Sequence, residues 1–152
     1  MLAFCAAHPD ALWRTCLEGH LTASGLIVDA AGECGLLCLH KKLGRWLQLG
    51  GHVDGDANLA AAALREGIEE SGIAGLRVDP EPIDLDAHRI PARANEPEHW
   101  HLDVRFLLVA PPDSTPVLSA ESLELRWFTK RELSSIPTDD SVRRLYELAG
   151  LA

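Results

Sequence analysis

The sequence predicts an α/β protein in which helices cover both faces of a mixed central sheet. The chain has 152 residues, of which 47% are hydrophobic, which is enough for one buried core. Several segments show the two-residue alternation of strands, and they are interrupted by one central helical pattern and followed by a closing one. No repeat, low-complexity tract or linker divides the sequence, so we expect residues 1–152 to form a single domain.

The individual elements follow from local patterns. Alternating segments bounded by turn residues predict strands over residues 21–28, 35–39, 46–49, 83–90, 101–110 and 123–128. Helical patterns predict helices over residues 8–18, 57–71 and 140–148, and a helical turn over residues 130–134. Alternation also gives two of the strands one polar face each, formed by Asp84, Asp86 and His88 in the first and by His101, Asp103 and Arg105 in the second.

Composition argues against several classes of partner. The net charge of −9 and the isoelectric point of about 5.1 disfavour binding to nucleic acid or to an anionic membrane surface. No apolar stretch reaches the length of a membrane span, and residues 1–7 are too short and lack the basic start of a secretory signal. Four irregularly spaced cysteines in a chain with ample apolar content favour reduced thiols. We therefore expect a cytoplasmic protein without nucleic-acid or membrane partners.

Three glutamates crowd one face of the predicted helix over residues 57–71. At about 100° per residue, Glu69 lies about 60° to one side of Glu66 and Glu70 about 40° to the other. Such a stripe is often only a solvated face, but glycines 50 and 51 ahead of the helix suggest a turn and a divalent-metal site. We expect the acids to project outward, because the opposite side carries an apolar stripe of Ala57, Ala61, Leu64 and Ile68.

The segment resembles the Nudix box, G-x5-E-x7-R-E-U-x-E-E-x-G-U, where U is a bulky apolar residue. Seven of the nine specified positions match: Gly51, Arg65, Glu66, Glu69, Glu70, Gly72 and Ile73. Two positions depart, because Ala57 stands in place of the first glutamate and Gly67 in place of the apolar residue after Arg-Glu. Asp56 lies one residue before the missing glutamate, where it could compensate or cap the helix. The resemblance implies the α/β/α sandwich of that family.

This resemblance also implies a chemistry. The resemblance to Nudix hydrolases implies cleavage of a nucleoside diphosphate linked to another group, with Mg²⁺ or Mn²⁺ held by the box glutamates. Carried over to this chain, the metal ligands are Glu66, Glu69, Glu70 and the backbone of Gly50. The catalytic candidates are Glu66, Glu69 and the loop residue Glu121. The structural positions are Gly51, which allows close approach, Arg65, which orients a carboxylate, and Gly72, which caps the helix.

A negatively charged protein needs cations to accept a diphosphate, and several basic or imidazole side chains are placed to help. Arginine can bind phosphate oxygens with two parallel hydrogen bonds. The expected substrate-binding residues are Arg45, His52, His88, Arg89, His101 and Arg105. The expected partner is a small diphosphate substrate, and the sequence leaves a homodimer open.

Two alternatives remain at this stage. A non-catalytic Nudix-like binding module would explain the departures at Ala57 and Gly67, although the three later glutamates are retained. An isomerase is suggested by His20 and His52, which resemble the histidines of the metal site in isopentenyl diphosphate isomerases. That pattern has a cysteine where this chain has Gly50, and it lacks the Arg-Glu and Glu-Glu pairs present here.

Overall fold

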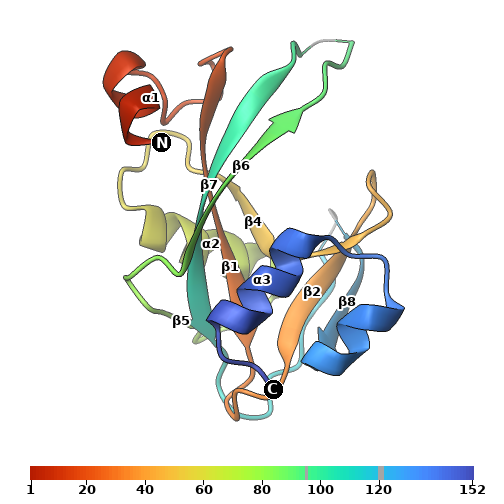
Figure 1. Cartoon of the computed structure of the whole chain (residues 1–152). Helices are drawn as coiled ribbons and strands as arrows, with labels where there is room; N and C mark the ends of the chain where they lie inside the picture. Colours follow the sequence, from red (N-terminus) through yellow and green to blue (C-terminus); the bar gives the residue numbers. More distant parts are fainter. Residues whose placement is uncertain (95, 120–121) are drawn as a thin grey trace.

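A computed structural model describes residues 1–94, 96–119 and 122–152 (Figure 1). Its strands are β1 (Gly19–Val28), β2 (Gly35–His40), β3 (Trp46–Leu47), β4 (Leu49–His52), β5 (Arg77–Val78), β6 (Asp84–Ile90), β7 (His99–Val109) and β8 (Ser122–Phe128). Its helices are α1 (Leu2–Ala7), α2 (Leu59–Ser71), the 3-10 helix η1 (Lys130–Ser135) and α3 (Asp140–Leu148). No helix in the described ranges is both long enough and apolar enough to cross a membrane.

The strands form one mixed sheet, as predicted, but the predicted strand over residues 46–49 is divided between β3 and β4, and β5 was not predicted. The central order is β3-β2-β1-β7-β5, with β4 paired to β1, β6 to β7 and β8 to β2. Only the β1–β7 pairing is parallel among these. Along one edge, β1 pairs with β4 through residues 22–25 and with β2 through residues 27–28, so the sheet divides at this point. The division places the end of β4 beside α2.

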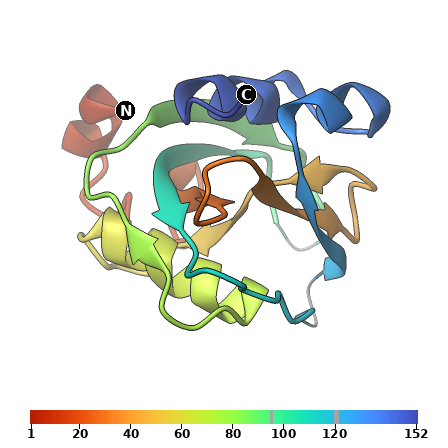
Figure 2. The same ribbon diagram turned by 90° about the horizontal axis from the view of Figure 1, so that it is seen from below.

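Helices cover both faces of the sheet, which confirms the predicted α/β/α layers. Figure 2 shows α2 on one side and α3 on the other. Successive residues of β1 point to opposite faces of the sheet and pack in two hydrophobic clusters. Ala23 and Ile27 belong to the cluster on the α2 side. Leu26 and Val28 belong to the cluster beneath α3. Tyr146 of α3 is fully buried in the second cluster.

The predicted helix over residues 8–18 is wrong. The helix lies earlier, at Leu2–Ala7, and residues 8–18 form successive turns, with hydrogen bonds such as Ala11 N–H to His8 O at 3.0 Å. Pro9 has no N–H to donate, and long-range contacts determine the path that follows. The Leu12 carbonyl accepts from Gly55 N–H at 2.9 Å, so this segment is bound to the loop before α2.

The glycine pair 50–51 lies in strand β4 rather than in a turn, which corrects a second expectation. Gly50 and Gly51 pair with Ser24 and Ala23 of β1. The turn comes after β4, where Asp54 and Gly55 have positive φ values of 48° and 89°. The helix that follows therefore faces the edge of a strand.

The buried face of α2 also differs from the predicted stripe. Its buried residues are Ala62, Ala63, Gly67 and Ser71, whereas Ala61 and Ile68 are exposed. Small residues let the helix approach the sheet closely. A Cβ added at Gly67 would lie 2.7 Å from Cδ2 of Leu108, which is fully buried. The helix packs through its smallest side chains, so hydrophobicity alone misassigned the face.

Only one of the two predicted ends of α2 agrees with the structure. Asn58 is the N-cap and its Oδ1 accepts from Ala61 N–H at 3.1 Å, while the Asp56 carboxylate accepts from Asn58 N–H at 2.8 Å. The helix therefore begins at Leu59 rather than at residue 57. At the other end Gly72 has φ 65° and caps the helix, as predicted.

Candidate functional site

Glu66 and Glu70 point from α2 toward strand β4. Glu70 Oε2 accepts a hydrogen bond from Gly50 N–H at 3.0 Å. Glu66 packs against Gly51, where an added Cβ would lie only 2.5 Å from Glu66 Oε2. The glycine thus creates the space that the carboxylate occupies. Both acids are partly buried and face the same two-residue segment, so the expectation that all three acids project outward is wrong.

Arg65 connects one of these carboxylates to the end of β4. Its Nη1 donates to Glu66 Oε1 at 2.6 Å and its Nη2 donates to the backbone oxygen of His52 at 3.1 Å. The guanidinium therefore fixes the orientation of Glu66 relative to the strand. This is the geometry of an arginine that orients a neighbouring carboxylate.

Glu69 is separated from the other two acids. Its side chain is 61% exposed and its Oε2 lies 3.6 Å from Arg65 Nη1. Within residues 1–94, 96–119 and 122–152, the three box glutamates do not form a group with ligand atoms within 4.8 Å of one another. The structure thus divides the acidic stripe into an inward pair, Glu66 and Glu70, and an outward residue, Glu69.

The inward pair has the donor chemistry of a divalent-cation site. Mg²⁺ and Mn²⁺ prefer oxygen ligands, and Mg²⁺ is commonly held in proteins by one or two carboxylates together with substrate phosphates. Two carboxylates converge on one strand segment here, and the positive φ values of Asp54 and Gly55 turn the chain sharply after it. These residues therefore fit a hard cation.

A second group of side chains gathers on the other side of β4. His20 of β1, His52 of β4 and His101 of β7 bring one nitrogen each within 4.8 Å of one another. The ring centroids of His20 are 5.0 Å from His52 and 4.8 Å from His101. His99 stacks on His20 at 5.0 Å, and His88 lies 5.6 Å from His101. Two of the expected substrate-binding histidines, His52 and His101, therefore lie together, and His88 is at the edge of the group.

Burial favours the neutral form of His20, His52 and His101 by lowering their pKa values. It is the largest cause that lowers the pKa of His101, to about 3, and the next is the nearby His20. Burial likewise lowers the pKa of His20 and of His52. The backbone of Cys16 lies near enough to oppose the shift at His20 in part, without reaching hydrogen-bond geometry. At neutral pH the group presents uncharged ring nitrogens, which are the form that binds metals.

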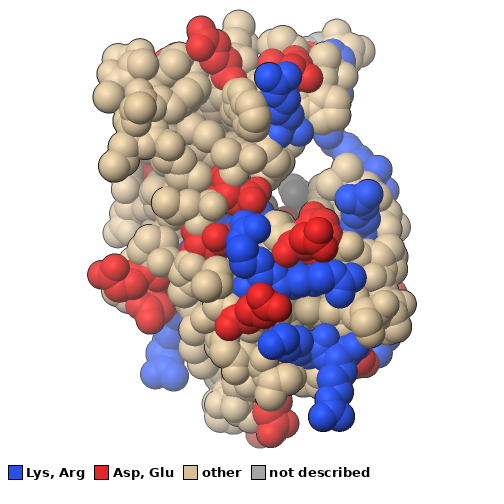
Figure 3. All heavy atoms as spheres, in the orientation of Figure 1, with Lys and Arg blue, Asp and Glu red and all other residues tan. Residues whose placement is uncertain are grey.

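Arg105 is buried within a network of carboxylates. Its guanidinium lies 2.8 Å from Asp103, 3.2 Å from Asp86 and 3.4 Å from Asp84. Arg144 of α3 reaches the last two carboxylates at 3.1 and 2.8 Å, and charges of both signs alternate on this face (Figure 3). The side chain of Arg105 is 3% exposed, which favours a structural role over the phosphate contact expected from the sequence.

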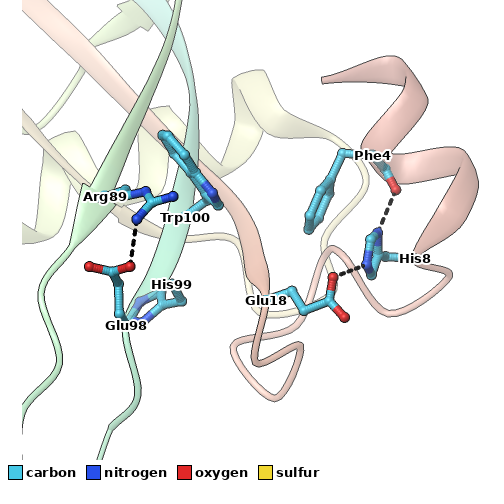
Figure 4. A pocket seen from close by; sticks show the side chains of 7 residues that line it. All are labelled: Phe4, His8, Glu18, Arg89, Glu98, His99 and Trp100. Atoms are coloured by element: carbon cyan, nitrogen blue, oxygen red, sulfur yellow. Dashed lines mark hydrogen bonds and ion pairs between the residues drawn. The ribbon is translucent and has the colours of Figure 1, made fainter.

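Two expected phosphate partners lie elsewhere. Arg89 pairs with Glu98 at 2.7 Å and lies over the ring of Trp100 at 4.9 Å. These residues line a groove of about 380 Å³ between α1 and the β6–β7 hairpin (Figure 4). Arg45 is exposed between β2 and β3. Glu121 lies outside the described residues.

Sequence reasoning missed the grouping of the histidines and the partners of Arg105. Strand register brings both sets of residues together. β1 pairs with β7 through His20 and His101, and β6 pairs with β7 through Asp84 and Arg105. The alternation that gives β6 and β7 polar faces was detectable, but the pairing of strands far apart in sequence was not.

The layers and the carboxylate-bearing helix beside β4 define a Nudix-like α/β/α domain. A sequence model of the NUDIX domain matches residues 19–149. The chain therefore belongs to the Nudix family of pyrophosphohydrolases. No curated protein sequence matches it at a significant level.

Solved structures share the fold. A hydrolase of the NUDIX family from Clostridium perfringens is 24% identical with a TM-score of 0.68, covering 86% of this chain and 96% of its own. An Ap4A hydrolase binary complex from Caenorhabditis elegans is 20% identical with a TM-score of 0.67, covering 86% and 94%. The NUDIX domain of NrtR from Shewanella oneidensis, complexed with ADP ribose, is 18% identical with a TM-score of 0.60, covering 86% and 85%.

Proposed function

We propose that this enzyme uses Mg²⁺ or Mn²⁺ to hydrolyse the phosphoanhydride of a nucleoside diphosphate linked to another group. The observation that carries the proposal is the convergence of Glu66 and Glu70 on Gly50 and Gly51 of β4. Like charges four residues apart destabilise a helix, so we expect the convergence of these two partly buried carboxylates to serve a bound cation.

Each residue of the site has a separate expected role. Glu66 and Glu70 would hold the cation, and Arg65 keeps Glu66 directed at the strand. The candidate general bases are Glu66 and the loop residue Glu121, either of which could accept a proton from water, whereas Glu69 is exposed outside the pair. When bound, the cation neutralises phosphate charge and lowers the pKa of its water.

The substrate class rests on the diphosphate chemistry of the family and on the neighbours. Ap4A and ADP ribose, named for two of the related structures, both contain adenosine phosphates joined by anhydride bonds. His52 and His101 lie on the other side of β4 from the carboxylate pair, are both partly exposed, and remain candidates for contact with the rest of the substrate. All four cysteines are free thiols, which supports a reducing compartment such as the cytoplasm.

The test is a substrate screen. The purified chain is incubated with nucleoside diphosphate conjugates and Mn²⁺ or Mg²⁺, and the products are separated by chromatography. We expect a nucleoside monophosphate and a phosphorylated second product from at least one conjugate. Chelation with EDTA should abolish turnover, and Glu70→Gln should lower kcat by at least about tenfold, because loss even of an outer-shell partner costs 10–100-fold. Full activity in EDTA would refute metal dependence.

A further inference from the structure

We propose that His20, His52 and His101 form a second metal site, which takes a transition metal of the Zn²⁺ class and is separate from the carboxylate site. Imidazole suits Zn²⁺ and its neighbours in the first transition row, whereas carboxylates suit Mg²⁺ and Mn²⁺. The two sites therefore differ in chemistry as well as in place.

The sheet itself assembles the three ligands. His20 lies directly across the parallel β1–β7 pairing from His101, and His52 lies across the β1–β4 pairing from Thr22. Residues 20 and 22 are two apart in β1 and share a face, so all three imidazoles project to the same side. Three different strands fix the backbone positions, and the remaining freedom is side-chain rotation.

His20 gives the strongest sign that a ligand is expected here. It is 2% exposed, and neither of its ring nitrogens has a hydrogen-bond partner in the described structure. Leaving a buried polar group unsatisfied costs roughly 1–3 kcal/mol, so such groups are rare unless a bound ion or water satisfies them. A metal ion at the centre of the three rings would satisfy one of these nitrogens.

The spacing is close to that of a bound site. In tetrahedral zinc sites Zn–N bonds of about 2.0–2.1 Å put neighbouring nitrogens about 3.4 Å apart. The three nitrogens here lie within 4.8 Å of one another, so each pair needs to approach by at most about 1.4 Å. His52 and His101 are only partly buried and can rotate, whereas His20 is held between His99 and its two partners. Three protein ligands leave a fourth position for water or substrate.

A carboxylate lies near each of the two flanking rings. His88 Nδ1 lies 3.0 Å from Asp86 Oδ2, and His99 Nε2 lies 3.8 Å from Glu96 Oε1. These acids make the region favourable for a cation without being ligands themselves. His52 also connects the two sites, because its backbone oxygen accepts from Arg65 while its imidazole is one of the three proposed ligands.

Direct metal binding tests the site independently of hydrolysis. The Glu66→Gln/Glu70→Gln variant, which removes the carboxylate pair, is titrated with Zn²⁺ in the presence of excess Mg²⁺ and followed by calorimetry. Co²⁺ is titrated separately, and its visible absorption reports tetrahedral coordination. We expect one saturable Zn²⁺ site and a tetrahedral Co²⁺ spectrum.

Single substitutions in that background identify the ligands. His52→Asn and His101→Asn should each weaken Zn²⁺ binding by at least the 10–100-fold that loss of an outer-shell partner costs. His88→Asn is the matched control, since this exposed histidine lies on the same face outside the triad, and it should keep the Zn²⁺ affinity. Absence of saturable Zn²⁺ binding, or equal affinity in the triad variants and the control, would overturn the proposal. Neither result depends on whether the enzyme hydrolyses a diphosphate.

Discussion

Arg105 shows how burial decides the role of a single side chain. A phosphate-binding arginine needs an accessible guanidinium, but this one is enclosed by Asp84, Asp86 and Asp103. Thr22 and Ser24 also donate to Asp103, at 3.0 and 2.7 Å. The network joins three strands, and Arg144 extends it to α3. Its members stabilise the polar half of this sheet face.

We predict that Arg105→Met destabilises the fold strongly. Removing one member of a buried ionic network leaves uncompensated charges, which costs roughly 3–5 kcal/mol. The matched control is Arg89→Met, which breaks an exposed pair and should cost about 1 kcal/mol or less. Urea unfolding of both variants measures the difference. Equal, small losses of stability would show that the carboxylates around Arg105 do not need it.

At the scale of the element, helix α2 combines one predicted property with one that was missed. The box spacing identified the acids and the closing Gly72, because these depend on local sequence. The packing face was missed because it depends on Leu108 of β7, whose two methyl groups occupy the space left by Gly67 and by Gly25 of β1. Gly67 therefore replaces the apolar residue of the box without loss of packing, since Leu108 fills the gap.

Substitution at this contact has a defined outcome. Gly67→Ala should destabilise the protein by about 1–3 kcal/mol, because the new Cβ overpacks against Leu108 and the gain in helix propensity is smaller. In the Leu108→Ala background the same change should be neutral or stabilising. Thermal unfolding of the four proteins of this double-mutant cycle gives the coupling. Additive effects would mean that the two residues do not share the space.

The other elements show the same difference between local patterns, which predicted structure correctly, and long-range contacts, which the sequence pattern does not contain. Most strand positions and the polar faces of β6 and β7 were predicted, since alternation is a local signal, whereas the two-residue strand β5 was missed. The segment 8–18 was misassigned as a helix because its turns are fixed by contacts with the loop at Gly55, which the local pattern does not contain.

At the scale of the whole molecule, sheet topology brings together residues that are far apart in sequence. His20, His52, His88, His99 and His101 come from four strands and meet on one face. The sequence indicated His20 and His52 as a pair, but the parallel β1–β7 pairing is needed to bring His101 beside them.

This grouping predicts a stability that depends on pH in the absence of metal. The pKa of His101 is lowered from 6.5 to about 3 in the folded state, so between these values the unfolded chain binds more protons. Stability should therefore be complete above pH 6.5 and fall below it, by up to about 1.4 kcal/mol per pH unit for each such histidine. His20, His52, His88 and His99 surround this ring, and the first two have pKa values shifted in the same direction.

Denaturant unfolding in EDTA from pH 7 to pH 4 measures this dependence. His101→Asn should flatten the curve over that range, because it removes the most strongly shifted group. His8→Asn is a useful comparison, since the pKa of His8 is raised and its loss should not flatten the curve in this direction. A wild-type stability that is constant from pH 7 to pH 4 would contradict the burial of neutral imidazoles.

The carboxylate pair on α2 is the centre of the account, and Mn²⁺ binding tests it most directly. Free Mn²⁺ is measured by electron paramagnetic resonance during titration of the wild type, Glu70→Gln and Glu69→Gln. We predict saturable binding in the wild type, binding weakened by at least about tenfold in Glu70→Gln, and nearly unchanged binding in Glu69→Gln, whose side chain is turned toward solvent. Wild-type affinity in Glu70→Gln, or its loss in Glu69→Gln alone, would contradict the assignment.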